Sequence, residues 1–202
     1  QNWNAVWENN YDPIRISDQV NIRASFHAPD PTVAMDIVIN PKMSFGTGHH
    51  ETTTLMVQAM FEISLEGKSV LDVGTGTGIL AFIALKLGAS RVHGFDIDPW
   101  SVENSIENAA LNACESATFQ EGTIRNEPLT AYDVVIANIN RNILLDEIAE
   151  YALRLASGGY LLLSGFYAED IPHLTDAAKP LGLQLEAETN LRNWACLRLR
   201  KN

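Results

Sequence analysis

The sequence contains only two cysteines, Cys114 and Cys196, which lie far apart among apolar or small neighbours. This argues against a CxxC redox motif, a cysteine-based zinc cluster and a disulfide framework. Long hydrophobic runs are also missing, since no stretch approaches the roughly 20 apolar residues of a membrane-spanning helix. The first residues show neither the basic head nor the apolar centre of a signal peptide. We therefore expect a cytoplasmic protein with reduced thiols and no membrane partner.

Basic residues are scarce as well: 14 Lys and Arg stand against 25 Asp and Glu, for a formal net charge of −11. This excess of negative charge repels a phosphate backbone, so nucleic acid is not expected as a partner. A basic protein fits the charge better, although an acidic surface is most often a means of staying soluble. The 202 residues, 46 % of them hydrophobic, suit one domain with a sizeable core, and we expect a monomer.

From Lys68 onward, short apolar runs alternate with helical patterns, which is typical of a sheet with helices on both faces. We predict strands at 68–74, 91–97, 116–122, 132–139 and 160–166, followed by a closing pair at 183–190 and 194–201. The helices between them are predicted at 79–89, 99–110, 141–156 and 169–182. Gly158 and Gly159 are expected to end the helix 141–156. In the helix 99–110 the predicted buried face is Val102, Ile106, Ala109 and Ala110.

Residues 1–52 do not show the alternation of strands and helices that begins at Lys68. We interpret them as a lead-in or linker segment ahead of a ligand-binding domain at 53–202. Short strands are predicted at 20–26 and 34–40, separated by a turn. A helix at 53–65 is expected to join this segment to the sheet.

Two glycine-rich stretches lie close together, "SFGTGHHETTT" at 44–54 and "DVGTGTG" at 72–78. The second is the better ligand loop, because its glycines fall where a strand turns into a helix and the backbone must bend sharply. Its spacing is G-x-G-x-G, whereas the dinucleotide fingerprint requires glycine where Ile79 stands. A shorter cofactor without a pyrophosphate is therefore expected, with its carboxylate at the helix N-terminus. The glycines in contact with it are Gly74, Gly76 and Gly78.

Two acids frame this loop. Asp96 ends the second predicted strand, where a carboxylate can accept both hydroxyls of an adenosine ribose, and Ile97 beside it is placed in the same site. Capping of the next helix suits Asp98 better than Asp96. Asp72 has two open roles, because it can hold the amino group of the cofactor or the loop itself.

The segments "VLDVGTGTGIL", "FDIDP" and "VIANI" resemble the class I methyltransferases that use S-adenosylmethionine. More narrowly, "FGTGHHETT" and "ANINRNIL" resemble the PrmA family, bacterial methyltransferases of ribosomal protein L11, and the similarity covers nearly the whole chain. This resemblance implies a Rossmann-like α/β fold with a seven-stranded, mostly parallel sheet whose last strand is reversed. It also implies methyl transfer to lysine or N-terminal amines of a basic ribosomal protein.

The resemblance further implies that Thr53, Gly74, Asp96 and Asn138 contact the cofactor. The first glycine-rich stretch then becomes a flexible lid rather than a phosphate loop. The lid residues are Phe45, Gly46, Thr47, Gly48 and His50. His49 and His50 are adjacent and have no completing ligands, so no metal is expected.

A lysine amine must lose its proton before it attacks, because its ordinary pKa is about 10.4. Asn138, at the end of a predicted strand, is our candidate catalytic residue, since its side-chain carbonyl can accept an amine N–H and orient the lone pair. The alternative role is capping of the following helix, for which Asn140 lies nearer.

Three other functions stay open. The same core serves methyltransferases that act on small molecules or on other proteins. An NAD-dependent oxidoreductase, or a binding module without activity, is disfavoured by the missing glycine at 79. A nucleic-acid methyltransferase would carry N-P-P-aromatic where this chain has "ANIN". The PrmA family also carries an N-terminal domain that binds the substrate, and nothing in this sequence resembles it. We therefore expect either a catalytic fragment or a relative with another substrate.

Overall fold

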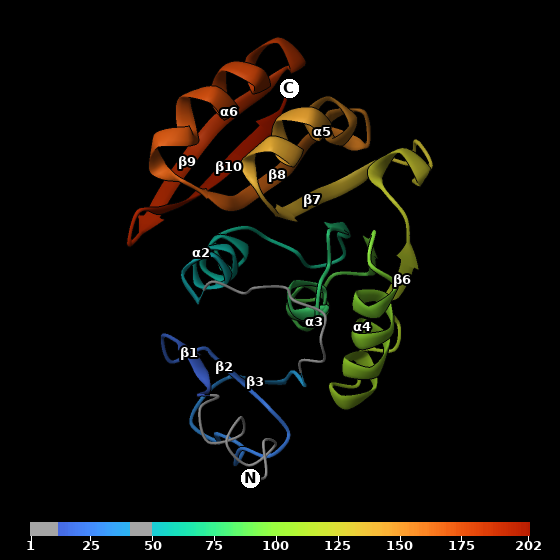
Figure 1. Ribbon diagram of the computed structural model, residues 1–202, viewed down its shortest axis with the longest axis vertical. Coiled ribbons are helices and arrows are strands. Elements are labelled where there is room, and N and C mark those ends of the chain that lie inside the picture. Colours follow the sequence, from blue (N-terminus) through green and yellow to red (C-terminus); the bar gives the residue numbers. More distant parts are fainter. Residues whose placement is uncertain (1–11, 41–49) are drawn as a thin grey trace, which may run out of the picture.

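The computed structural model describes residues 12–40 and 50–202, and it shows two sheets with helices packed around the larger one (Figure 1). The larger sheet has seven strands in the order β6-β5-β4-β7-β8-β10-β9. Their bounds are β4 (Ser69–Val73), β5 (Arg91–Asp96), β6 (Thr118–Glu121), β7 (Tyr132–Asn138), β8 (Leu155–Tyr167), β9 (Leu183–Leu191) and β10 (Trp194–Lys201).

Strand direction follows the predicted pattern. The pairs β4 with β5, β5 with β6, β4 with β7 and β7 with β8 are parallel. Strand β10 runs antiparallel to both of its neighbours, β8 and β9. The prediction of a seven-stranded, mostly parallel sheet with a reversed last strand is therefore confirmed.

Helices cover both faces of this sheet (Figure 1). The helices are α2 (His50–Phe61), α3 (Ile79–Lys86), α4 (Pro99–Leu111), α5 (Arg141–Leu153) and α6 (Ile171–Ala178), with short 3-10 turns at Ile124–Asn126, Ala168–Asp170 and Lys179–Leu181. Successive residues of β4 point to opposite sides: Val70 joins the core with α2 and α3, and Leu71 joins the core with α5 and α6. Such alternation is the period of a strand that is buried on both faces. Within the described ranges, no helix combines the length and the apolar character needed to cross a membrane.

The segment before α2 forms its own small sheet of β1 (Ile14–Ile16), β2 (Val20–Arg23) and β3 (Met35–Val38). Strands β2 and β3 were predicted and pair in parallel, whereas the three-residue β1 was not predicted. The apolar side chains of this small sheet, among them Val20 and Ile37, belong to the same core cluster as α2 and α3. The lead-in therefore packs directly against α2 and α3.

Two predicted helix boundaries were wrong. Helix α2 begins at His50 and ends at Phe61, so it lies about one turn earlier than 53–65. Helix α5 ends at Leu153, and Gly158 and Gly159 do not terminate it but lie inside β8. There the register jumps: Leu155 pairs with Tyr132 and Tyr160 pairs with Val134, so residues 156–159 bulge out opposite Asp133. Glycine suits this bulge because Gly158 has a φ of +77°.

The predicted buried face of α4 was also wrong, except for Ala109. Ile106 is 54 % exposed, while four polar side chains are buried in its place. They are Ser101, Asn104, Ser105 and Asn108. The prediction failed because apolar periodicity assumes an apolar neighbour, whereas this face of α4 packs against backbone groups that need hydrogen bonds.

Candidate functional site

The candidate site lies at the carboxyl edge of the parallel strands. Strand β4 is the point where the order of the sheet reverses, because the chain continues to β5 on one side and later returns to β7 on the other. Ligands of open α/β sheets bind outside the strand ends at such a point. The residues that leave the sheet there include Gly74 after β4, Asp96 at the end of β5 and Asn138 at the end of β7.

The glycine loop between β4 and α3 needs its glycines. Gly74, Gly76 and Gly78 have φ angles of +65°, +59° and +87°, in a region that other residues rarely adopt. A Cβ on Gly74 would also come within 2.7 Å of Cγ2 of Ile139. Gly78 is the N-cap residue of α3 and provides no side-chain cap, so the first turn of this helix suits a carboxylate ligand.

Asp72 lies beneath this loop and is only 2 % exposed. Its carboxyl group accepts a hydrogen bond of 2.8 Å from the Thr75 hydroxyl and another from the backbone of Ala81. Burial, together with the smaller effect of the neighbouring Asp96 charge, raises its pKa from 3.8 to about 7 against the effect of these hydrogen bonds. The hydrogen bond from Thr75 shows one of the two roles considered for Asp72, which is to hold the loop.

This pKa leads to a prediction about stability. Between about pH 4 and pH 7 the folded protein keeps the Asp72 proton that the unfolded chain has lost, so the free energy of unfolding falls as the pH rises. The shift of about three pKa units corresponds to an upper value of ~4 kcal/mol. Asp72→Asn keeps a neutral polar group and removes this dependence. We expect the difference in unfolding temperature between Asp72→Asn and the wild type to be smallest near pH 4 and to grow in favour of the variant up to about pH 7.

Thermal unfolding of both proteins from pH 4 to pH 8 measures this effect, because every other titrating group is common to the two proteins. Parallel curves for wild type and Asp72→Asn would contradict the raised pKa.

Asp96 ties the glycine loop to β5. Its Oδ2 accepts the backbone N–H of Gly76 at 3.0 Å, and its Oδ1 accepts the N–H of Asp98 at 3.0 Å. Each carboxylate oxygen has a further lone pair for a ligand hydroxyl. Asp98 caps α4 by accepting the Trp100 N–H at 2.9 Å, which confirms that the capping role belongs to Asp98. Ile97, between the two acids, is 69 % exposed and offers apolar surface beside the Asp96 carboxylate.

Asn138 meets the first turn of α2. Its Nδ2 donates to Oγ1 of Thr52 at 3.4 Å, which directs Oδ1 of the same amide elsewhere. Asn140 caps α5, since its Oδ1 accepts the Ile143 N–H at 3.1 Å, so the capping alternative belongs to Asn140. Thr53 is buried in the same turn of α2. Sequence reasoning missed Thr52, because a run of three threonines does not reveal which one faces β7.

A second set of unpredicted residues lies at the same edge. Strand pairing places Trp194 opposite Tyr167, beyond the Ser164 that pairs with Asn138, and the two rings stack at 4.3 Å. The hairpin turn before Trp194 brings Arg192 within 3.3 Å of Glu51 in the first turn of α2. No motif marks these residues, and only the insertion of β10 beside β8 brings them to this edge.

Several predicted lid residues, Phe45, Gly46, Thr47 and Gly48, lie outside the described residues, as does His49. His50 is the first residue of α2 and is exposed. Among the residues that the structure describes, no group of three or more His, Cys, Asp or Glu side chains is arranged to hold a metal ion.

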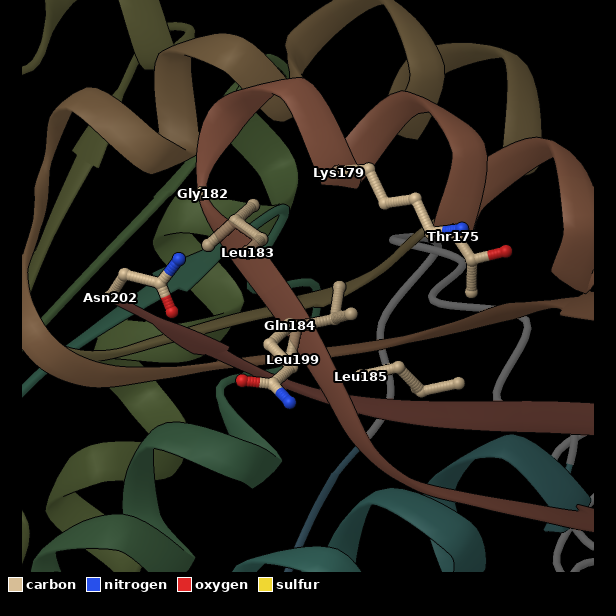
Figure 2. Close-up of a pocket in the computed structure, with 8 residues that line it drawn as sticks. All are labelled: Thr175, Lys179, Gly182, Leu183, Gln184, Leu185, Leu199 and Asn202. Atoms are coloured by element: carbon tan, nitrogen blue, oxygen red, sulfur yellow. The ribbon is translucent and has the colours of Figure 1, made fainter.

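A groove of about 400 Å³ lies at the other end of the sheet (Figure 2). It runs between α6 and the beginning of β9 and is lined by Thr175, Lys179, Gly182, Leu183, Gln184, Leu185, Leu199 and Asn202. Because β9 begins and β10 ends there, the groove is at the amino edge of the parallel strands and contributes no residue to the candidate site.

The sheet order with its reversed strand, the G-x-G-x-G loop after β4 and the acid at the end of β5 define a class I methyltransferase, whose methyl donor is S-adenosylmethionine. A family model described as "Ribosomal protein L11 methyltransferase (PrmA)" matches residues 1–202. The chain therefore belongs to the PrmA family of S-adenosylmethionine-dependent methyltransferases.

Three known proteins illustrate this relationship. A ribosomal protein L11 methyltransferase of Porphyromonas gingivalis is 51 % identical over 201 residues, which cover 98 % of this chain and 69 % of that protein. The crystal structure of a ribosomal protein L11 methylase from Lactobacillus delbrueckii subsp. bulgaricus superposes with a TM-score of 0.88 at 30 % identity, over 95 % of this chain and 99 % of that one. Magnesium protoporphyrin IX methyltransferase of Synechocystis, solved with bound S-adenosylmethionine, shares the fold: its TM-score is 0.61 at 18 % identity, over 75 % and 82 % of the two chains.

The residues present fit this cofactor. The glycine loop has the left-handed backbone that lets a ligand approach main-chain N–H groups, and Asp96 adds a carboxylate with free lone pairs beside it. The exposed Ile97 provides an apolar surface next to that carboxylate.

Proposed function

We propose that this chain transfers methyl groups from S-adenosylmethionine to amines of ribosomal protein L11, either lysine side chains or the N-terminal α-amine. The names of its relatives, which are methyltransferases of ribosomal protein L11, support L11 as the substrate. The observation that carries the amine acceptor is the Asn138 amide, whose Nδ2 is engaged by Thr52 and whose Oδ1 is thereby directed away from α2 at the carboxyl edge of β7.

In this proposal the site contacts both ends of the cofactor. Asp96 accepts the ribose hydroxyls and Ile97 contacts the adenine side, while Thr53 and the loop from Gly74 to Gly78 hold the methionine end. Asp72 adds a negative or hydrogen-bonding group below that loop, and its second role, toward the amino group of the cofactor, remains part of the proposal. When bound, S-adenosylmethionine supplies an electrophilic methyl group on a positively charged sulfur.

The protein then has to place an uncharged amine. Asn138 Oδ1 accepts one N–H of the acceptor and turns the nitrogen lone pair toward the bound methyl donor, which is catalysis by orientation. Asn138 does not titrate, so it takes no proton, and the amine is expected to lose its proton to solvent beforehand. The rate should therefore rise with pH below the acceptor pKa of about 10.4 for a lysine.

The net charge of −11 supports a basic protein as the partner, because opposite charges steer association and their effect falls with ionic strength. Absence of a nucleic-acid partner, a cytoplasmic location and a monomeric state belong to the same proposal. Methylation of a small molecule or of another protein is the competing outcome of the experiment.

We expect labelled S-adenosylmethionine to methylate purified ribosomal protein L11, and mass spectrometry to locate the label on lysine or on the N-terminal amine. L11 whose amines have been acetylated is the matched control and should take up no label. The reaction should be run with the 202-residue chain and with a form extended to the length of its longer relatives.

Label on acetylated L11 would contradict the amine acceptor. Small-molecule amines are tested as acceptors in parallel. If both lengths of the enzyme label only these small molecules and not L11, the proposal of a protein substrate is contradicted.

A further inference from the structure

One face of α4 carries asparagine at every fourth position, at Asn104, Asn108 and Asn112 at the end of the helix. The side chains are buried, and Asn104 and Asn108 have no exposed surface. Buried amides cost free energy unless both their N–H and C=O groups are bonded. The hydrogen-bond partners of these asparagines therefore explain why this buried face of α4 is polar.

On one side the asparagines hold the chain that leaves β3. Asn112 bonds Val38 in both directions, accepting its N–H at 2.8 Å and donating to its carbonyl at 2.7 Å. One turn earlier, Asn108 Oδ1 accepts the N–H of Asn40 at 3.1 Å, and Asn104 donates to the Asn40 carbonyl at 2.8 Å. Side chains of α4 thus take the place of a neighbouring strand for residues 38–40.

On the other side the same face holds the cofactor loop. Asn108 Nδ2 donates to the carbonyl of Thr77 at 3.0 Å, and Ser105 Oγ donates to the carbonyl of Gly76 at 2.9 Å. The N–H of Gly76 is bonded to Asp96. The centre of the loop is therefore fixed from two directions, by Asp96 at the end of β5 and by α4.

These bonds set the direction of the loop N–H groups. In a trans peptide the carbonyl and the following N–H point to opposite sides. Because the Gly76 carbonyl is directed at α4, the Thr77 N–H points away from α4. The Gly78 N–H, which follows the Thr77 carbonyl, is bonded to the Thr75 carbonyl inside the loop.

We propose that Asn108, assisted by Ser105, is a positioning residue for S-adenosylmethionine: one buried amide locks the cofactor loop at Thr77 to the chain at Asn40 and so presets the loop for the ligand. Asn112 also bonds backbone, at Val38 on β3 and at the Asn108 carbonyl of its own helix, but it does not touch the loop. This difference separates positioning of the cofactor from simple support of the fold.

The test compares Asn108→Ala, Asn112→Ala and Ser105→Ala by calorimetric titration with S-adenosylhomocysteine and by thermal unfolding without ligand. Asn108→Ala and Asn112→Ala should both lower the unfolding temperature, since the first removes two hydrogen bonds to buried backbone groups and the second removes three. Asn108→Ala should raise the Kd of S-adenosylhomocysteine about tenfold, which corresponds to 1.4 kcal/mol. Asn112→Ala should leave this Kd within about twofold of the wild type, a change below 1.4 kcal/mol.

Equal changes of Kd in Asn108→Ala and Asn112→Ala would overturn the proposal, and so would a wild-type Kd in Asn108→Ala. If Asn108→Ala does not fold, Ser105→Ala decides alone, because it removes one hydroxyl: a weakened Kd supports the proposal and an unchanged Kd overturns it. The inference rests on the cofactor site and not on the acceptor, so the outcome is independent of whether L11 is the substrate.

Discussion

Replacement of Asn138 by alanine is expected to lower the turnover number for methyl transfer by about 100-fold, the cost of a misplaced reactant in an active site. The amide is the group at the carboxyl edge of β7 that can accept an amine N–H, and its Nδ2 is already engaged by Thr52. The folded structure should persist, because Asn138 caps no helix. Turnover is measured with saturating S-adenosylmethionine and acceptor, alongside the Kd of S-adenosylhomocysteine.

Asn140→Ala is the matched control for this variant. It removes the same kind of side chain two residues away, and with it the cap of α5, which is worth about 1 kcal/mol of stability. We expect a lower unfolding temperature but nearly normal turnover. If Asn140→Ala loses as much turnover as Asn138→Ala, or if Asn138→Ala remains active, the orienting role of Asn138 is refuted.

Asp96→Ala is expected to raise the Kd of S-adenosylhomocysteine by about 100-fold or more. The carboxylate now accepts the N–H groups of Gly76 and Asp98, and two ribose hydroxyls are expected to add to them. Hydrogen bonds to a charged group contribute about 1.5–3 kcal/mol each, so the loss of the ribose contacts alone accounts for such a change. Calorimetric titration of the variant measures it.

Asp98→Ala serves as the control, because Asp98 lies beside Asp96 and caps α4 through the Trp100 N–H. It should lose about 1 kcal/mol of stability and little affinity for the ligand. A Kd that rises equally in the two variants would show that Asp96 supports α4 and the loop without binding the ribose.

The parts of the fold that the sequence predicted are those set by local rules. The strands around Leu71 and Ile136 are apolar on both faces, and such runs indicate a buried parallel sheet. The loop at 74–78 was recognisable because its backbone conformation requires glycine. The caps formed by Asp98 and Asn140 were predicted from their positions at element ends, and the ribose contact of Asp96 stays a prediction of the same kind.

The parts that escaped prediction depend on partners distant in sequence. The polar face of α4 is explained only by the backbone at 38–40 and 76–77, which no local pattern reveals. The contact of Thr52 with Asn138 and the stacking of Trp194 on Tyr167 arise from strand order. The bulge at 156–159 was read as a helix end because two glycines fit both structures equally well.

The place of β10 has a consequence for how the chain folds during synthesis. Strand β8 is made before β9 and β10, and its outer edge is covered by β10, the last strand of the chain to be made. Until then an eight-residue run of β8, from Tyr160 to Tyr167, presents unpaired backbone groups along its outer edge. Exposed edges of this kind pair readily with other chains. A ribosome that stalls before β10 emerges would therefore release a product prone to aggregation rather than a slightly shortened enzyme.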